Sequence, residues 1–386
     1  MWRHIASNAL SLFVVVLFLA GGVILWGVNQ YESEGPLARA ICLKVAPGSN
    51  MTRVANQLVD EGAISSRAIF RMGADYTDKA GQLKAGSFLI NEKASMEQIV
   101  DTVTASGQST CGTEVVYRVG VNRLSVQVRE LDPEVNRFVE RAVFNPAEDE
   151  APEAYANAKE GADTRFRIAI AEGVTSWQIV TSLRDIDVLS GAVPEIPPEG
   201  ALAPDSYEVS PRDERGALVA QMAEAQEARL STAWENRRDG LPYETAAEAL
   251  IMASIIEKET GQPEERGQVA SVFVNRLERG MRLQTDPTVI YGITRGEGVL
   301  GRGLRQSELR RETPWNTYVI DGLPPTPIAN PGVASIEAAL NPDATDYIFF
   351  VADGTGGHAF ATTLAEHNQN VARWRAIEAE RAEQSE

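Results

Sequence analysis

The hydrophobic pattern at the start of the chain predicts one membrane-spanning helix. No charged residue occurs at positions 5–31, and the centre of this stretch reads LSLFVVVLFLAGGVILWGV. At 1.5 Å of rise per residue, about 20 apolar residues cross the hydrocarbon core of a bilayer. A cleaved signal peptide has a shorter apolar region, of roughly 7–15 residues, and a small-residue cleavage site. We therefore expect an uncleaved anchor, and Arg3 weakly favours a cytoplasmic N-terminus because basic residues stay on that side.

A weak internal repeat follows the anchor. Two copies place a glycine, Gly48 or Gly173, after a short apolar stretch, with apolar residues at +6 and +10 from it: Val54, Leu58, Ile179 and Leu183. A third, fainter copy has Lys93 in place of glycine, followed by Ile99 and Val103. Each copy predicts a short strand, a turn, and a helix that starts near Ser or Thr. Glycan-binding modules use such units, but so do many α+β proteins, so carbohydrate contact and simple packing both stay open.

The pattern is interrupted at residues 132–163, which are acidic and contain Pro146 and Pro152. Proline removes a backbone donor and breaks long helices. We interpret this stretch as a partly mobile insert. A solvated loop is a simpler reading of its charge than a tether for a partner.

A helical period returns near position 244. Residues 244–260 (ETAAEALIMASIIEKET) and 264–281 predict two helices, the first of which stops before Gly261 and Pro263. Loops rich in Thr, Asp, Pro and Gly follow. Residues 347–352 (YIFFVA) predict a strand that turns at 354–357 into its partner at 358–362. The last helix is expected from Leu364 to about Arg381. The predicted class is therefore α+β.

Composition excludes several functions. With 54 acidic and 36 basic residues the formal charge is −18, which argues against nucleic-acid binding. Three histidines and two cysteines are too few for most metal sites, and no His-Glu-x-x-His, Gly-x-Ser-x-Gly or phosphate-loop motif occurs. We expect no cofactor and no metal. Cys42 and Cys111 would meet an oxidising compartment outside the membrane, where either a disulfide or two buried thiols is consistent with the sequence.

One glutamate follows a long apolar run. Glu257 comes directly after LIMASII at positions 250–256, so a helix would attach its carboxyl to an apolar face. Desolvation of a carboxyl raises its pKa, and a general acid needs a raised pKa at neutral pH. Glu259 lies about 200° further around the helix, so both cannot face one cleft. Pairing of these glutamates with Lys258 or Arg266 is the alternative, and composition alone favours it.

Polar and aromatic residues gather in the loops that follow. They occur at 283–291 (LQTDPTVIY), 315–318 (WNTY), 322–325 (GLPP) and 356–360 (GGHAF). Planar rings beside amide and hydroxyl groups suit a sugar polymer, which offers apolar CH faces and many hydroxyls. Asn and Thr also satisfy turns locally, so this pattern alone is only suggestive.

Several long motifs in the C-terminal half resemble those of one known family. They are 253–260 (ASIIEKET), 269–277 (VASVFVNRL), 281–292 (MRLQTDPTVIYG), Tyr318, and 349–354 (FFVADG) running into Gly357-His358. In this order they resemble the endolytic murein transglycosylases, the YceG-like family. The resemblance is dense over about 240–370 and thin over 41–107 and 166–210, where the family has small LysM-like units. The acidic stretch at 132–163 departs from the family pattern and leaves the geometry between these parts in doubt.

The resemblance implies a membrane-anchored lytic transglycosylase. It would cut the N-acetylmuramic acid β-1,4 N-acetylglucosamine bond within nascent strands, leave 1,6-anhydromuramic acid ends, and so terminate strand elongation. Glu257, the first glutamate of the Glu-Lys-Glu-Thr motif, would be the catalytic residue, and Asp286 would support a positively charged transition state. The other motif positions are expected to line the cleft as substrate-binding residues: Asn275, Gln284, Thr285, Asp286, Tyr291, Asn316, Tyr318 and His358. A non-catalytic glycan-binding scaffold of the cell-wall machinery is the alternative.

The sequence and the resemblance together predict a single-pass inner-membrane protein with a periplasmic bulk. Its partners would be peptidoglycan strands, the inner membrane and, by the resemblance alone, peptidoglycan synthases (penicillin-binding proteins). The expected parts are a cytoplasmic tip and anchor at 1–35, a LysM-like module at 36–110, the acidic insert or linker at 111–165, a second LysM-like unit with a linking helix at 166–240, a catalytic domain at 241–375 and a polar tail at 376–386.

Overall fold

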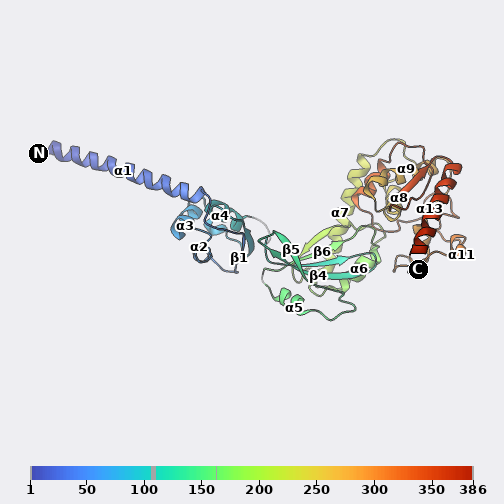
Figure 1. Cartoon of the computed structure of the whole chain (residues 1–386), viewed down its shortest axis with the longest axis horizontal. Coiled ribbons are helices and arrows are strands. Elements are labelled where there is room, and N and C mark those ends of the chain that lie inside the picture. The colour runs from blue at the N-terminus through green and yellow to red at the C-terminus, as the bar shows by residue number, and fades with distance from the viewer. Residues whose placement is uncertain (1, 106–109, 162, 385–386) are drawn as a thin grey trace. The chain divides into compact units, whose positions relative to one another are not determined.

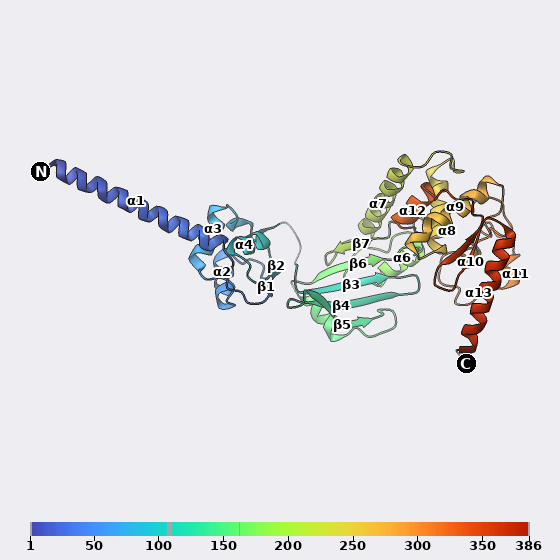
Figure 2. The same cartoon turned by 45° about the horizontal axis from the view of Figure 1, so that its top comes forward.

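The computed structural model describes residues 2–105, 110–161 and 163–384, and the chain divides into two compact units (Figures 1 and 2). Unit 1 comprises residues 1–115, 127–143 and 151–166, and unit 2 comprises 116–126, 144–150 and 167–386. The chain combines helices and strands, largely in separate runs rather than in strict alternation, which confirms the α+β class. The predicted domain boundaries stay predictions. Position 162 of the acidic stretch and positions 385–386 of the tail lie outside the described residues.

Helix α1 (Trp2–Glu32) carries the apolar stretch at the start of unit 1. Its segment Phe13–Glu32 is long and apolar enough to cross a membrane, which fits an anchor and equally a signal sequence. The last turn is packed rather than free, because Tyr31 is only 7% exposed. Its ring lies so close to Gly73 that a Cβ built on that glycine would be 2.2 Å from the ring.

The next elements form a small module within unit 1. They are β1 (Ile41–Val45), α2 (Met51–Asp60), α3 (Arg67–Tyr76), the 3₁₀ turn η1 (Ala80–Gln82), β2 (Gly86–Ile90) and α4 (Met96–Thr104). Strands β1 and β2 pair antiparallel, from Ile41 opposite Ile90 to Val45 opposite Gly86. Apolar residues of the helices close over this hairpin into one core, including Val54, Leu58, Phe70 and Ile99. Their burial is the main source of stability for so small a unit.

The three copies of the repeat adopt the same local structure. Gly48, Lys93 and Gly173 all have a positive φ, of 74°, 56° and 76°. Each turn leads into a helix capped by a polar side chain: Asn50 for α2, Ser95 for α4 and Thr175 for α6 (Ser176–Arg184). The apolar residues at +6 and +10 are fully buried in every copy. The predicted strand–turn–helix unit is confirmed, except that Asn50 rather than Ser49 caps the first helix.

A five-stranded sheet follows, in the order β5-β4-β3-β6-β7. Its strands are β3 (Thr113–Val119), β4 (Leu124–Asp132), β5 (Arg137–Phe144), β6 (Arg165–Ile170) and β7 (Ser206–Val209). The acidic stretch at 132–163 therefore contributes the end of β4, all of β5 and helix α5 (Glu153–Glu160). The two prolines stand outside the helix, and Pro152 is its N-cap residue.

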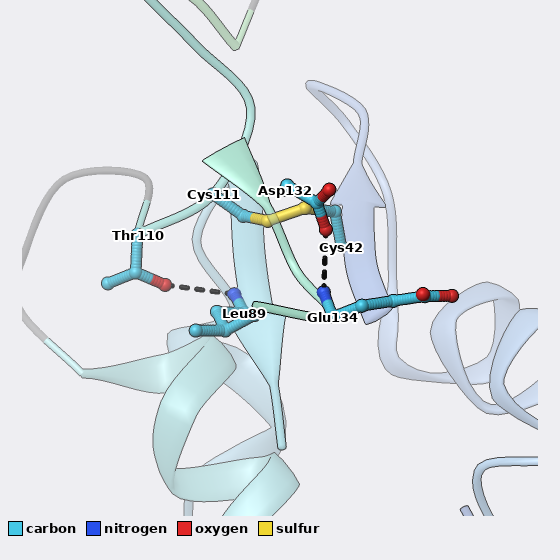
Figure 3. Close-up of a disulfide and its surroundings, with 6 residues drawn as sticks. All are labelled: Cys42, Leu89, Thr110, Cys111, Asp132 and Glu134. Atoms are coloured by element: carbon cyan, nitrogen blue, oxygen red, sulfur yellow. Dashed lines mark hydrogen bonds between the residues drawn. A yellow bond between two sulfur atoms is a disulfide. The ribbon is translucent and has the colours of Figure 1, made fainter. Parts of the chain in front are cut away.

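A disulfide joins Cys42 of β1 to Cys111, with 5.6 Å between the Cα atoms (Figure 3). The backbone beside it is also paired, because Cys111 N donates to Ser87 O at 3.0 Å and Leu89 N donates to Thr110 Oγ1 at 2.9 Å. The bridge closes 69 residues of sequence. It therefore ties the β1–β2 hairpin to the segment that enters β3.

The C-terminal part of unit 2 is mainly helical. Its elements are α7 (Arg215–Glu235), α8 (Ala246–Glu259), η2 (Pro263–Glu265), α9 (Arg266–Glu278), α10 (Asp286–Thr294), α11 (Gln306–Leu309), α12 (Val333–Leu340), β8 (Phe349–Ala352), β9 (His358–Ala361) and α13 (Leu364–Gln384). Helices α8, α9 and α12 share one apolar core. The predicted helices at 244–260 and 264–281, the hairpin and the last helix are confirmed. The loops expected between them contain α10 and α12. Helix α10 has a proline in its first turn, and Gly332 is the N-cap residue of α12.

Candidate active site

The site is built on the last turn of α8. A capping box begins this helix, in which Thr245 accepts from Glu248 N and the Glu248 side chain accepts from the backbone of Thr245. Residues 251–256 are buried, so the helix is fixed in the core up to the residue before Glu257. The half-buried Glu257 side chain reaches Gly332, whose N–H donates to Glu257 Oε2 at 3.0 Å. A backbone donor therefore orients this carboxyl at the edge of the core.

The turn of the second repeat copy packs beside Glu257. A Cβ built on Gly173 would lie 3.5 Å from both Glu257 Cγ and Lys258 Cδ. Lys258 Nζ donates to Gly173 O at 3.2 Å, and Gly173 N donates to Asn330 O at 2.9 Å. The loop at 171–175, the end of α8 and the segment before α12 thus meet at one place, although they are far apart in sequence.

A second carboxyl, which the sequence analysis missed, lies at the same place. A Cβ built on Gly332 would be 1.8 Å from Glu172 Oε1, so only glycine allows this approach. Arg266 Nη2 lies 3.7 Å from Glu172 Oε2, and the Glu172 side chain is 46% exposed. Partial burial and, secondly, the charge of Glu257 raise the pKa of Glu172, while Arg266 opposes the shift. The signal available in the sequence was its position directly before the repeat glycine.

Glu199 forms a buried polar cluster behind this loop. It accepts from Ser176 N at 2.8 Å and from Tyr291 OH at 3.3 Å. Burial raises the pKa of Glu199 and raises that of Tyr291 to about 12. Burial also lowers the pKa of Lys258, against the charges of Glu257 and Glu199. Acidic groups and one desolvated lysine therefore surround the predicted catalytic residue.

A pocket of about 310 Å³ opens next to Lys258. Its walls are largely apolar and come from the second repeat copy, from α10 and from the loop after α10, including Thr175, Ile290, Tyr291, Leu300 and Arg302. Glu257 itself is not a wall residue. The pocket nevertheless shares Lys258, the next residue of α8, with the Glu257 site.

Glu259 faces a different group of residues, as its helical position predicts. Thr285 Oγ1 donates to Glu259 Oε1, and burial raises the pKa of Glu259. Next to it, Tyr318 OH donates to Asp286 Oδ1 at 2.7 Å. Three of the predicted cleft residues, Thr285, Asp286 and Tyr318, therefore gather near Glu259.

The remaining predicted cleft residues have local partners. Asn275 Nδ2 donates to Thr345 O and Tyr347 O at 2.9 and 2.8 Å, and Asn316 Nδ2 donates to Arg311 O at 2.7 Å. His358 Nδ1 lies 2.8 Å from Glu265 Oε2. Gln284 is exposed and has a φ of 49°. Asn275 and Asn316 thus stabilise loops, and contact of these residues with a substrate stays a prediction.

No group of three or more His, Cys, Asp or Glu side chains that could hold a metal ion occurs within residues 2–105, 110–161 and 163–384. The acid–base groups that the structure brings together at this site are foremost the carboxyls of Glu257 and Glu172.

The fold and the site define the class of protein. It is an α+β protein with an N-terminal apolar helix and a glutamate at the end of a buried helix. The chain belongs to the YceG-like family, whose model matches residues 43–136 and 143–373. This confirms the family that the motifs indicate.

Named relatives extend the comparison. The chain is 29% identical over 359 residues to the "Endolytic murein transglycosylase" of Bacillus subtilis, which covers 91% of this chain and 89% of that protein. It is 26% identical over 379 residues to the protein of the same name in Streptococcus pneumoniae, covering 96% of this chain but 65% of that protein. A solved structure of a yceG-like protein, lmo1499 from Listeria monocytogenes, has 25% sequence identity, covers 86% of this chain and 99% of that chain, and has a TM-score of 0.46.

Proposed function

We propose that the protein is a membrane-anchored endolytic lytic transglycosylase of peptidoglycan. It cleaves the bond between N-acetylmuramic acid and N-acetylglucosamine in nascent strands, which leaves 1,6-anhydromuramic acid ends and terminates elongation. The activity named for the relatives supports this activity class. The observation that carries the assignment is the placement of Glu257, which a backbone N–H orients at the end of α8, beside the turn at Gly173.

The reaction needs one carboxyl that first gives and then takes a proton. Protonated Glu257 donates its proton to the glycosidic oxygen as the bond from that oxygen to C1 of the muramic acid breaks. The resulting carboxylate, which accepts the Gly332 N–H, then removes the proton of the 6-hydroxyl of the same sugar. Oxygen O6 bonds to C1 and closes the anhydro ring, and Glu257 is protonated again. Hydrolytic glycosidases instead use two carboxyl groups and a water.

Glu172 fits a supporting role in this reaction. The transition state at C1 has oxocarbenium character and is positively charged. An ionised carboxylate beside it lowers the energy of that charge. Glu172 lies against Gly332, the residue that also contacts Glu257, and is proposed here for this electrostatic role; the same role expected of Asp286 stays a prediction. Asp286 itself accepts a hydrogen bond from Tyr318 OH and lies near Glu259.

The location and the accessory parts belong to the same proposal. Helix α1 stays attached as a single-pass inner-membrane anchor, and the rest of the chain lies in the periplasm. The β-α-α-β order of residues 41–90 and the repeated turn at Gly173 support two small LysM-like units that contact glycan. Peptidoglycan synthases (penicillin-binding proteins) are the partner class that the family resemblance suggests.

Substitution of Glu257 tests the proposed activity. Glu257→Gln keeps the shape of the side chain and removes its acid–base function, so anhydro-ended products should fall by about 10²- to 10⁴-fold while glycan binding persists. Glu278→Gln, at the exposed end of α9, is the matched control and should retain activity. If neither wild type nor Glu257→Gln releases anhydro-ended products although both bind glycan, the protein is a non-catalytic glycan-binding scaffold.

A further inference from the structure

An exposed apolar stripe lies on α3, in the module of unit 1. Ala68, Met72 and Tyr76 follow one another at intervals of four residues, and Met72 and Tyr76 are 61% and 92% exposed. The opposite face of α3 is buried through Ile69, Phe70 and Ala74. The stripe is therefore not part of the core of the module.

This helix is held against the end of α1. The Tyr31 ring covers Gly73, and Ser65 Oγ, just before α3, donates to Gln30 Oε1 at 3.4 Å. Both views show α3 at the end of the module where α1 joins it (Figures 1 and 2). On the helix surface Met72 directly precedes Gly73, so the exposed stripe flanks the side of α3 that α1 contacts.

The length of α1 limits the depth of this contact in a bilayer. Twenty residues span about 30 Å, which equals the hydrocarbon thickness; the apolar segment Phe13–Glu32 would end just past Tyr31, and the window 9–28 would end before it, at residue 28. Tyr31 lies three residues further, about 4.5 Å beyond that boundary. The headgroup layer is roughly 5–7 Å thick on each side, so Tyr31 and the α3 residues packed on it lie at headgroup level.

We propose that the stripe Ala68–Met72–Tyr76 is a membrane-contact surface that lies on the phospholipid bilayer where the anchor leaves it. This inference rests on the proposal that α1 remains as an anchor. Tyrosine and methionine suit this layer, because tyrosine concentrates at membrane interfaces and methionine packs on irregular apolar surfaces.

The charges around the stripe point to an apolar rather than a strongly electrostatic contact. Arg67 and Arg71 are exposed on α3, and basic side chains at interfaces can contact lipid phosphates. Asp60 lies 3.6 Å from Arg67, and Asp75 is exposed on the same helix. The surface is close to neutral, so it tolerates zwitterionic lipid.

Photo-crosslinking of the full chain tests this contact. The variants Met72→benzoylphenylalanine and Tyr76→benzoylphenylalanine are reconstituted in vesicles of phosphatidylethanolamine and phosphatidylglycerol. The control is the variant Val135→benzoylphenylalanine. Val135 is an apolar residue of the same unit and is 60% exposed, which matches Met72 closely. After illumination, mass spectrometry should find several-fold more phospholipid adduct at positions 72 and 76 than at 135.

Two kinds of failure are distinguishable. Carbonate extraction of the same vesicles shows whether α1 holds the chain in the bilayer, and release of the chain would overturn the anchor together with the contact. A retained chain with no more lipid adduct at 72 and 76 than at 135 would overturn the contact alone. Adducts between two copies of the protein in place of lipid adducts would also overturn it, because the stripe would then be a protein interface.

Discussion

At the residue scale, two carboxyl groups converge on one glycine. Gly332 donates its N–H to Glu257, and its missing side chain leaves the space that Glu172 occupies. Arg266 lies beside Glu172, and Lys258 donates to the carbonyl oxygen of Gly173. The chemistry of Glu257 is therefore expected to depend on a neighbour contributed by the loop at 171–175.

Glu172→Gln should lower kcat with little change in KM, because the charge acts on the transition state. One charge in a partly solvated site is worth about 1–2 kcal/mol, on the order of tenfold in rate. Since the pKa of Glu172 is raised, its negative charge appears only as the pH rises through that value. The wild-type rate should therefore increase over this range, and the variant should lose that limb of the pH profile. An unchanged profile would contradict the role of Glu172.

Gly332→Ala should disrupt the site sterically. The added methyl group would meet the Glu172 carboxyl, so we expect loss of activity and a loss of about 1–3 kcal/mol in the free energy of unfolding. Gly216→Ala, on α7 with open space around it, is the control and should be neutral or stabilising by about 1 kcal/mol. Urea unfolding and product analysis measure both effects, and equal behaviour of the two variants would refute the steric argument.

Glu259→Gln should change the pH dependence of stability. The pKa of Glu259 is raised in the folded protein, so wild-type stability falls as the pH rises from the unfolded value of about 4.5 through the folded one. Glutamine does not ionise and still accepts from Thr285. The difference in melting temperature, variant minus wild type, should therefore grow from acidic to neutral pH. A melting-temperature difference that does not change with pH would show that Glu259 titrates alike in the folded and unfolded states.

At the element scale, the disulfide is the strongest local constraint in unit 1. A bridge that closes 69 residues restricts the unfolded chain and contributes about 2–4 kcal/mol. The double variant Cys42→Ser, Cys111→Ser should lower the melting temperature, measured against wild type under oxidising conditions. Reduction of the wild type should reproduce the loss, and reduction of the variant should change nothing. Equal stability of all forms would contradict this contribution.

The local elements could be predicted from the sequence because they are specified locally. The apolar spacing of +6 and +10 located three helices correctly, even where Lys93 replaces the glycine and still adopts a φ of 56°. Helices α10 and α12 were expected as loops. Both helices are short and begin beside turn residues, Pro287 and Gly332, so they were not separated from the loops although residues 333–340 (VASIEAAL) are mainly apolar, and both pack on α8.

The candidate site could be predicted only in part, for the same physical reason. Glu257 follows from the motifs, because its apolar run alone left pairing with Lys258 or Arg266 the favoured interpretation. Glu172 does not, because its role depends on a loop and a glycine that are 160 residues apart and meet only in the folded unit. Asn275 and Asn316 match motif positions, but each donates to backbone carbonyls of loops, and the sequence cannot distinguish this from contact with a sugar.

At the scale of the whole molecule, the net charge of −18 gives no long-range attraction toward acidic stem peptides. Under the proposed function, glycan would be held by local contacts, for which the largely apolar pocket beside Lys258 is the candidate. If α1 is retained as the proposed anchor, it would compensate for weak steering by confining the protein to the membrane.

The most direct test of the central claim is the origin of the oxygen at the new glycan ends. The full-length protein is incubated with peptidoglycan strands in ¹⁸O-labelled water, and the muramyl ends are analysed by mass spectrometry. If Glu257 directs the sugar's own 6-hydroxyl to C1, the ends are 1,6-anhydro and carry no label. Reducing ends that carry ¹⁸O would show that water attacks C1, and would contradict the account.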